Sequence, residues 1–446
     1  MFRRNIEIEL QKWAENPYRK PLILRGARQV GKTTVVNRFA EKFDNYLSVN
    51  LEKSSAKQLI ESTDEVKKLL PLLFLYCNVK RKEGRTLLFI DEIQQSVHTV
   101  ALLRYFYEEL PEIYVIAAGS LLETVLDKQV PVPVGRAEFM ALHPCNFVEF
   151  LTATGNSRYI EILAEPSFST ALHQEFIQLF NIYALIGGMP EVVARYAAEQ
   201  DIVSLSATYN QLLNAYKSDV AKYAETTTQG TVIRYILEEG WAFSGQNITF
   251  GGFAGSPYKA RETGEAFRTL AKAMLLELTY PVTQTIPPAI SDLKKSPKLF
   301  WLDAGLVNYS AGIQREYLFN KDLMDTWRGA AAEQIVAQEL RALSFDVGFK
   351  LNYWMRNKRG SSAEVDFIWQ QDGKIIPIEV KSGHNAHLKS IHQFMNETNH
   401  GIAIRIWSGP YSVDQVKTLI KKEFRLINMP FYMISQLPQI ILEESS

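Results

Sequence analysis

The alternation of apolar and polar positions predicts a repeating strand–helix pattern in the first part of the chain. Residues 21–25, 86–90 and 113–120 are short, almost wholly apolar runs, as expected of strands buried on both faces of a parallel sheet. Residues 34–43 and 100–110 have the length and spacing of helices. We therefore expect an α/β domain in which a parallel sheet carries helices on both faces.

Beyond about residue 200 the pattern changes from strand–helix alternation to a run of helices. Residues 205–223, 231–241 and 259–274 are expected as helices, and residues 275–282 as a strand. Helices followed by a strand-rich end are typical of a winged-helix module, which we expect in the middle of the chain.

The C-terminal part combines a helix with a hairpin. Residues 325–343 are expected as the helix, and two alternating runs flank Asp372 and Gly373, a strong signal for a two-residue hairpin loop. With that loop, Asp366 lies opposite Glu379 on the same face of the hairpin.

The segment between the first strand and the first helix fits the phosphate-binding pattern G-x-x-x-x-G-K-[ST]. Its glycines let backbone N–H groups converge on a triphosphate, and the helix N-terminus adds partial positive charge. Lys32 is expected to reach the β- and γ-phosphates, and Thr33 to hold Mg²⁺. The predicted ATP-binding residues are Gly26, Ala27, Arg28, Gln29, Val30, Gly31, Lys32, Thr33 and Thr34.

Two acids end the second expected strand and complete the predicted site. Asp91 would bind Mg²⁺, and Glu92 would orient or deprotonate the attacking water. The alternative for these two acids alone is a strand that runs into an acidic loop without a functional role. The phosphate-binding loop upstream decides between the two in favour of nucleotide binding, with ATP and Mg²⁺ as the cofactors.

Two further residues are candidates for catalysis. Ser120 follows a neighbouring strand, where AAA-type ATPases carry a polar residue near the γ-phosphate; the alternative is an N-cap for the next helix. Arg136 lies in a constrained loop, and an arginine there can stabilise charge on the transferred phosphoryl group, in cis or across a subunit interface. The alternative for Arg136 is an ordinary surface residue.

The order of several motifs resembles the prokaryotic predicted AAA-superfamily ATPases that carry a C-terminal domain of unknown function. The resemblance covers nearly the whole chain and implies ATP binding and hydrolysis, a winged-helix-like middle module and no established biological role. The motifs are residues 26–34, 88–94, 118–123, 134–136, 143–151 and 187–191.

The third expected helix of the middle module carries charged residues on one face. Arg261, Glu265, Arg268 and Lys272 follow one another at helical spacing. The functional interpretation is a recognition helix whose cations contact DNA phosphates. The alternative is a solvated face on which Glu265 pairs with its neighbours.

The hairpin also shows the spacing D-x(n)-E-x-K, which resembles the PD-(D/E)xK nucleases at Asp366, Glu379 and Lys381. The resemblance implies an α+β, restriction-endonuclease-like domain with a divalent metal ion. Helical periodicity places Glu333 on an apolar face, where it needs a partner, and Glu339 on the opposite, wet side. We predict Glu333, Asp366 and Glu379 as metal ligands and Lys381 as a residue that assists hydrolysis.

The alternative for this segment is a plain amphipathic hairpin without a metal. Glu364 and Lys381 would then form only a cross-strand ion pair. Pro377 also argues for caution, because proline is disfavoured in a central strand.

Length and charge limit these hypotheses. The 446 residues are enough for several domains, which we place at residues 1–200 (ATPase), 201–290 (winged-helix-like) and 291–446 (nuclease-like). The 49 basic and 49 acidic residues give no net charge, so nucleic acid would have to bind to local patches. Two cysteines and the absence of an apolar signal core or spanning segment lead us to expect a soluble, cytoplasmic protein without membrane contact.

Two functional hypotheses follow. The first is a Mg·ATP-dependent ATPase coupled to a module that binds DNA and cleaves it with a metal ion. The second is a nucleotide-dependent switch that binds a protein partner, with a nuclease-like domain that is not catalytic. A homo-oligomer is expected if Arg136 acts across a subunit interface.

Overall fold

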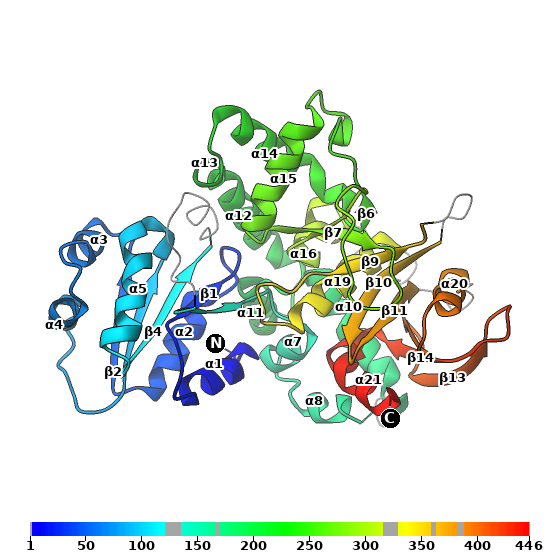
Figure 1. Ribbon diagram of the computed structural model, residues 1–446, viewed down its shortest axis with the longest axis horizontal. Helices are drawn as coiled ribbons and strands as arrows, with labels where there is room; N and C mark the ends of the chain where they lie inside the picture. Colours follow the sequence, from blue (N-terminus) through cyan, green and yellow to red (C-terminus); the bar gives the residue numbers. More distant parts are fainter. Residues whose placement is uncertain are drawn as a thin grey trace.

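A five-stranded parallel sheet forms the N-terminal part of the computed structural model, which describes residues 2–120, 135–165, 170–314, 329–357, 363–381 and 388–445 (Figure 1). Its strand order is β2-β3-β4-β1-β5. All neighbouring strands are parallel, as the apolar runs predicted. The strands are β1 (Leu22–Arg25), β2 (Asn45–Asn50), β3 (Thr86–Asp91), β4 (Ile113–Gly119) and β5 (Glu138–Ala141).

Helices cover both faces of this sheet. Alternate strand residues point to opposite faces, so Leu24 packs with α1 and α2, whereas Ile23 packs with α3, α4 and α5. The prediction of a parallel sheet between two helical layers is therefore confirmed. The helices are α1 (Ile6–Glu15), α2 (Lys32–Phe39), α3 (Ser54–Ile60), α4 (Val66–Tyr76) and α5 (Val97–Glu109). Within the described ranges, none of the helices has both the length and the apolar character needed to cross a membrane.

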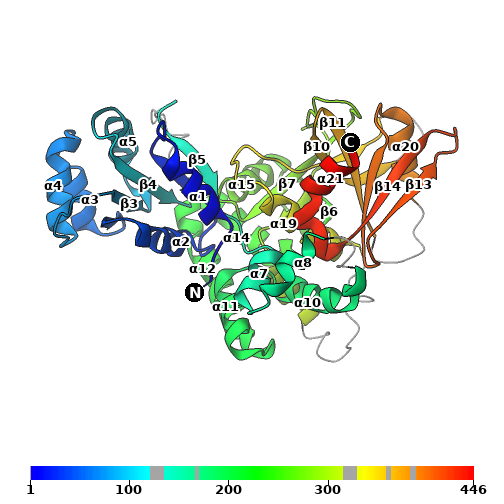
Figure 2. The same ribbon diagram turned by 90° about the horizontal axis from the view of Figure 1, so that it is seen from below.

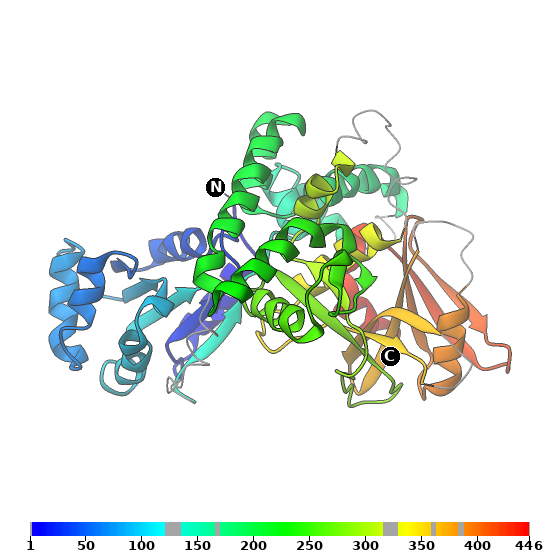
Figure 3. The same ribbon diagram turned by 90° about the horizontal axis from the view of Figure 1, so that it is seen from above.

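A layer of helices follows the first sheet and lies between it and a second sheet (Figures 1 and 3). The helix expected at 205–223 is two helices, α12 and α13, and those expected at 231–241 and 259–274 are α14 and α15. The helices are α7 (Phe147–Ala153), α8 (Arg158–Leu163), α10 (His173–Ile186), α11 (Pro190–Glu199), α12 (Ser206–Ser218), α13 (Val220–Tyr223), α14 (Thr227–Glu239) and α15 (Ala260–Lys272).

The second sheet has nine strands in the order β13-β14-β12-β11-β10-β9-β7-β8-β6. Its strands are β6 (Gln246–Asn247), β7 (Leu276–Val282), β8 (Lys298–Trp301), β9 (Asn352–Met355), β10 (Glu364–Gln371), β11 (Lys374–Lys381), β12 (Ile402–Trp407), β13 (Ser412–Lys417) and β14 (Glu423–Pro430). The helices around it are α16 (Ala304–Ser310), α19 (Ala330–Ala342), α20 (Lys389–Glu397) and α21 (Leu437–Ser445).

The second sheet joins the middle and C-terminal parts of the chain. β7 pairs antiparallel with β8 and, through its other edge, parallel with β9. The short strands that follow α14 and α15 are therefore continuous with the strands of the predicted nuclease-like region.

The hairpin of β10 and β11 has the predicted register. Asp372 and Gly373 form its loop with φ angles of 49° and 68°, as a two-residue turn with positive φ requires. Phe367 pairs with Ile378, the register that was expected from the sequence. Pro377 is accommodated within β11 because pairing with β12 begins only at Ile378.

The helix α19 is buried on all sides, and here one expectation was wrong. Glu339, expected on the wet side, is 2% exposed, because α19 packs between the helical layer that contains α7 and α10 and the second sheet (Figure 2). Its carboxylate accepts hydrogen bonds from the backbone N–H of Phe147, at 3.0 Å, and from the hydroxyl of Tyr183, at 2.5 Å. Burial raises the pKa of Glu339 to about 7.

The burial of Glu339 predicts that the free energy of unfolding depends on pH. Comparing the wild type with the variant Glu339→Gln measures the part of this dependence that comes from Glu339. Because the folded-state pKa of Glu339 is raised from 4.5 to about 7, its contribution to stability is full below pH 4.5 and is lost by about pH 7. Glu339→Gln mimics the protonated carboxyl, so its free energy of unfolding relative to the wild type should rise by about 1–3 kcal/mol between pH 5 and pH 8. Urea unfolding followed by circular dichroism measures it. A constant difference at both pH values would contradict the prediction; the exposed Glu109→Gln is the matched control.

Candidate functional site: the phosphate-binding loop and the buried carboxylate cluster

The loop between β1 and α2 has the backbone geometry of a phosphate cradle. Gln29 and Gly31 both have positive φ angles, 66° and 95°, which turn successive N–H groups to one side. A Cβ on Gly26 would lie 2.5 Å from the carbonyl oxygen of Leu142, so only glycine fits there. The loop can therefore lie against β5 and still lead directly into the N-terminus of α2.

Lys32 points back into this loop. Its Nζ donates to the carbonyl oxygens of Gly26 and Ala27, both at 2.8 Å, and the residue is 7% exposed. Burial lowers the pKa of Lys32 to about 8, although Glu92 and Asp91 nearby oppose the shift. The ammonium group is thus held where the loop N–H groups converge.

Asp91, the last residue of β3, and Glu92, which follows it, lie at the same edge of the sheet. The hydroxyl of Thr33 donates to Oδ2 of Asp91 at 2.8 Å. Mg²⁺ prefers oxygen ligands, so this hydroxyl and this carboxylate have the chemistry that a Mg²⁺ site requires. Glu92 receives a hydrogen bond from the side-chain amide of Gln94. Burial raises the pKa of Glu92. A carboxylate with a raised pKa is a stronger base, so Glu92 can accept a proton more readily.

Ser120 lies at the edge of the sheet that carries the phosphate-binding loop, whereas Arg136 lies at the opposite edge. β4 is inserted between β3 and β1, so Ser120, at its end, is at the edge that carries the loop and Asp91. Arg136 precedes β5, which runs parallel to β1, and so lies at the opposite edge. There its Nε is 2.5 Å from Oε1 of Glu108. The N-cap alternative for Ser120 involves the helix expected after it, which lies outside the described residues.

Two arginines bind the loop to its surroundings. Arg4, which no motif marks in the sequence, is buried beneath the loop and donates to the carbonyl oxygens of Val30, at 3.1 Å, and His143, at 2.8 Å. Arg28 belongs to the loop, but its guanidinium is ion-paired with Asp219, between α12 and α13. The loop is therefore in direct contact with the helices of the middle module.

The second group of predicted site residues lies around a lysine that was not predicted. Nζ of Lys298, at the start of β8, is 2.9 Å from Glu333, 2.8 Å from Glu364 and 3.5 Å from Asp366, and its side chain is 4% exposed. Burial alone would lower the pKa of Lys298, but the carboxylates of Glu333, Asp366 and Glu364 raise it. In the sequence nothing distinguishes Lys298 from the lysines that precede it.

Glu379 and Lys381 form a separate pair beside this cluster. Nζ of Lys381 is 2.7 Å from Oε1 of Glu379, whereas the other carboxylate oxygen of Glu379 is buried without a hydrogen-bond partner. Burial raises the pKa of Glu379 to about 7. Across the described ranges, no three His, Cys, Asp or Glu side chains form a group able to hold a metal ion. The ammonium group of Lys298 lies between two of the predicted metal ligands, Glu333 and Asp366.

Comparisons with known proteins agree with the geometry of the first site. Residues 18–151 match the model of a family described as an AAA domain, while residues 177–317 and 328–424 each match a domain of unknown function (DUF8612 and DUF4143). The chain therefore carries an AAA-type P-loop ATPase domain, which holds the Lys32 loop and Asp91.

Similarity to individual proteins is low. An uncharacterized protein of Methanocaldococcus jannaschii is 25% identical over 236 residues, which are 49% of this chain and 47% of that protein, so the match spans about half of the curated relative. A solved Walker-type ATPase of Pyrococcus abyssi is 15% identical, over 70% of this chain and 96% of that one, with a TM-score of 0.42. That structural similarity is too weak to support an argument.

The lowered pKa of Lys32 predicts how nucleotide binding depends on pH. A phosphate-binding lysine must be protonated, and at a pKa of about 8 it loses its proton as the pH rises from 7.5 to 9. Affinity for ADP should fall roughly tenfold over that range. Fluorescence titration with a labelled ADP analogue measures it. Lys32→Arg keeps its positive charge over this range, so its affinity for ADP should change less than about twofold between pH 7.5 and pH 9. An equal loss of affinity in both proteins would contradict the assignment of Lys32 as the titrating phosphate-binding group.

The Lys298 cluster predicts a large, pH-dependent loss of stability when the lysine is removed. Lys298→Met leaves three carboxylates facing one another in a buried site, at a cost of about 3–5 kcal/mol at pH 8. The loss should shrink at pH 5.5, where Glu333, whose pKa is about 7, is protonated. Urea unfolding at the two pH values measures it, with the exposed Lys295→Met as the control. A loss below 1 kcal/mol at pH 8 would contradict the interpretation.

Proposed function

We propose that this protein is a Mg·ATP-dependent ATPase whose nucleotide state is transmitted to the middle and C-terminal modules. The observation that supports it is that Lys32, the Thr33–Asp91 pair and Glu92 all lie at one edge of the parallel sheet. Each has the chemistry that phosphoryl transfer to water requires.

In this proposal each residue has one task. Lys32 exchanges its bonds to the loop carbonyls for bonds to the β- and γ-phosphates, which become its charged partners. Glu92, oriented by Gln94, accepts the proton of the attacking water. Magnesium bound by Thr33 and Asp91 would neutralise charge on the phosphates. Gly26, Ala27, Gln29, Val30, Gly31 and Thr34 supply loop N–H groups or loop geometry.

Two residues have subsidiary proposed roles. Ser120 contacts the γ-phosphate from the end of β4, because its strand lies between the loop strand and the Asp91 strand. Arg136 lies at the far edge of its own sheet, so it can reach a phosphate only in a neighbouring subunit of a homo-oligomer.

Replacing the proposed base tests the ATPase directly. Glu92→Gln should keep ATP affinity within about threefold while the steady-state hydrolysis rate falls at least about a hundredfold, because only proton transfer is lost. Phosphate release with Mg²⁺ measures hydrolysis, and Glu109→Gln, at the opposite edge of the sheet, is the control. Unchanged hydrolysis in Glu92→Gln would exclude Glu92 as the base.

For the rest of the chain we propose the division 1–200, 201–290 and 291–446, with a winged-helix-like middle module and a nuclease-like C-terminal fold that binds DNA. α14, α15, β6 and β7 support the winged-helix assignment, and both strands pair antiparallel with β8, which lies just beyond residue 290. The matched register of the β10–β11 hairpin supports the nuclease-like fold.

Whether the C-terminal fold cleaves DNA distinguishes the two hypotheses. Lys298 among Glu333, Glu364 and Asp366 favours a non-catalytic domain, and so the nucleotide-dependent switch. The intact pair of Glu379 and Lys381 favours the nuclease. Cleavage of labelled DNA with Mg²⁺ or Mn²⁺, lost in Asp366→Ala, would establish the nuclease; no cleavage with ATP turnover intact would establish the non-catalytic alternative.

A further inference from the structure

The junction between α12 and α13 lies directly against the phosphate-binding loop. The hydroxyl of Tyr216, near the end of α12, donates to the carbonyl oxygen of Arg28 at 3.2 Å. Asp219, between the two helices, is ion-paired through its carboxylate with the guanidinium of the same arginine. A short segment of the middle module therefore contacts one loop residue both at its backbone and at its side chain.

Arg28 belongs to a charge cluster in which two cations balance two carboxylates. Its guanidinium is paired with Asp219 and also lies 3.6 Å from Oε1 of Glu52. Nζ of Lys222, on α13, is bound to the same two acids, at 3.2 Å from Glu52 and 3.6 Å from Asp219. The positive charge of Arg28 is therefore already balanced, and a further anion can bind it only by weakening these pairs.

Arg28 is the third residue of the loop, and two effects on pKa place its charge near the proposed catalytic groups. The pKa of Lys32 is lowered chiefly by burial, and the positive charge of Arg28 lowers it further. The pKa of Arg28 is raised chiefly by its hydrogen bond to Asp219, and the charge of Glu92 contributes to the rise. Lys32 is the proposed ligand of the β- and γ-phosphates and Glu92 is the proposed base, so a γ-phosphate would lie within electrostatic range of Arg28.

A γ-phosphate and Asp219 are alternative partners for this guanidinium. Both are anions that bind arginine through the same forked set of N–H donors. Two anions at short distance also repel one another in a partly buried site, and the side chain of Asp219 is only 7% exposed. Lys222 remains beside Asp219 if Arg28 turns to the phosphate. The cluster can therefore exchange one partner for the other without leaving a buried carboxylate unpaired.

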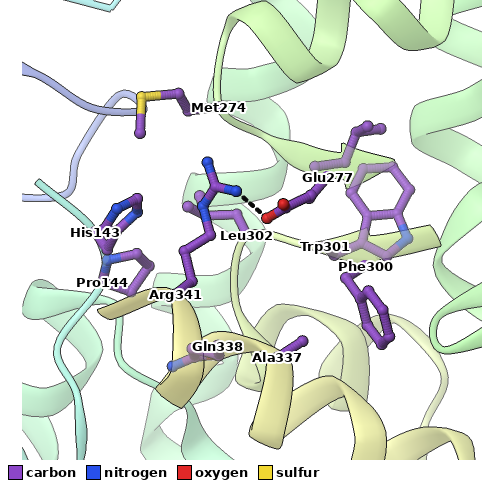
Figure 4. Close-up of a pocket in the computed structure, with 11 residues that line it drawn as sticks. His143, Pro144, Met274, Glu277, Phe300, Trp301, Leu302, Ala337, Gln338 and Arg341 are labelled. Carbon is purple, nitrogen blue, oxygen red and sulfur yellow. Dashed lines mark hydrogen bonds and ion pairs between the residues drawn. The ribbon is translucent and has the colours of Figure 1, made fainter. Parts of the chain in front are cut away.

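The junction is connected to the second sheet through packed elements. α13 packs against α14, and α14 against α15, where the side-chain amide of Gln229 donates to the hydroxyl of Thr269 at 3.0 Å. α15 packs against β7, and Glu277 of β7 is ion-paired with Arg341 of α19. Figure 4 shows these two side chains pointing toward one another. A change at the junction therefore has a continuous series of contacts through which to reach α19 and the second sheet.

We propose that the γ-phosphate of ATP competes with Asp219 for Arg28, so that ATP binding loosens the junction of α12 and α13 from the loop. Asp219 is then a positioning residue, which acts on the nucleotide through Arg28. The inference rests on the proposed ATPase function and deepens it, by naming the contact through which the nucleotide state reaches the middle module. Because linkage is reciprocal, the factor by which ATP favours release of the junction equals the factor by which release favours ATP.

Replacing Asp219 tests the competition by the direction of the effect. Asp219→Asn removes the competing charge, so it should tighten binding of a non-hydrolysable ATP analogue at least about fivefold. Affinity for ADP, which lacks the γ-phosphate, should change less than about twofold. Loss of a merely structural contact would not tighten binding. Displacement of a labelled ADP analogue measures both affinities and shows that the variant is folded.

Two further variants serve as controls. Asp219→Glu restores the negative charge and should return the affinity for the ATP analogue to within about threefold of the wild type. Glu238→Gln breaks the ion pair with Lys217 that joins α12 to α14, at 3.8 Å, without touching the loop. This matched control should leave both affinities unchanged.

Hydrogen exchange at residues 216–224 measures release of the junction in the wild type itself. The ATP analogue should speed exchange there at least about fivefold relative to ADP, because release is the step that the γ-phosphate favours. In Asp219→Asn the exchange should be fast with either nucleotide. The wild-type measurement decides the question even if Asp219→Asn proves unstable.

The outcomes are separable. Tighter binding of the analogue in Asp219→Asn, together with faster wild-type exchange in its presence, supports the competition. Unchanged or weaker analogue binding in Asp219→Asn, equal tightening of ADP, tightening in Glu238→Gln, or wild-type exchange no faster with the analogue than with ADP would each overturn it. Phosphate release measured in parallel distinguishes the two proposals: ATP turnover without these effects defeats only the competition, and analogue-dependent exchange without turnover defeats only the ATPase.

Discussion

The structure depends on satisfying the polar side chains of the buried helix α19. A buried amide or carboxylate without a partner costs about 1–3 kcal/mol or more, so each such group on α19 requires a partner in a specific neighbouring segment. The partners come from all parts of the chain: Gln334 bonds Ser244 and Trp301, Gln338 bonds Ala304 and Tyr183, Glu339 bonds Phe147 and Tyr183, and Arg341 bonds Glu277. One helix thus places the ATPase domain, the middle helices and the second sheet relative to one another.

The motif at residues 187–190, Gly-Gly-Met-Pro, fixes another close contact between segments far apart in the chain. A Cβ on Gly188 would overlap the carbonyl oxygen of Cys145, and the N–H of Gly188 donates to Asp303 at 2.5 Å. Asp303 is fully buried, and burial raises its pKa to about 6. The two glycines of the motif are therefore explained by close backbone packing against Cys145 and the start of α16.

Lys32 and Lys298 are both buried lysines, but the charges around each side chain suit them to different roles. Burial lowers the pKa of Lys32, which donates to neutral carbonyl groups and so keeps its capacity for an anionic ligand. Lys298 lies among carboxylates that outweigh the effect of burial, so its charge is already balanced within the protein. The first arrangement is suited to binding phosphate, and the second to maintaining a fold.

The sequence by itself determined the local features: the phosphate-binding loop, the acids after β3, the parallel strands, and the β10–β11 hairpin with its register. These follow from short-range rules, since the loop depends on glycine at set spacing and the hairpin on Asp372 and Gly373. Only the tertiary structure decided that Glu339 is buried, that Arg136 is at the far edge of the sheet, and that Lys298 lies among Glu333, Glu364 and Asp366. Each of these depends on contacts between residues far apart in the chain, which the periodicity of a single helix or strand does not encode.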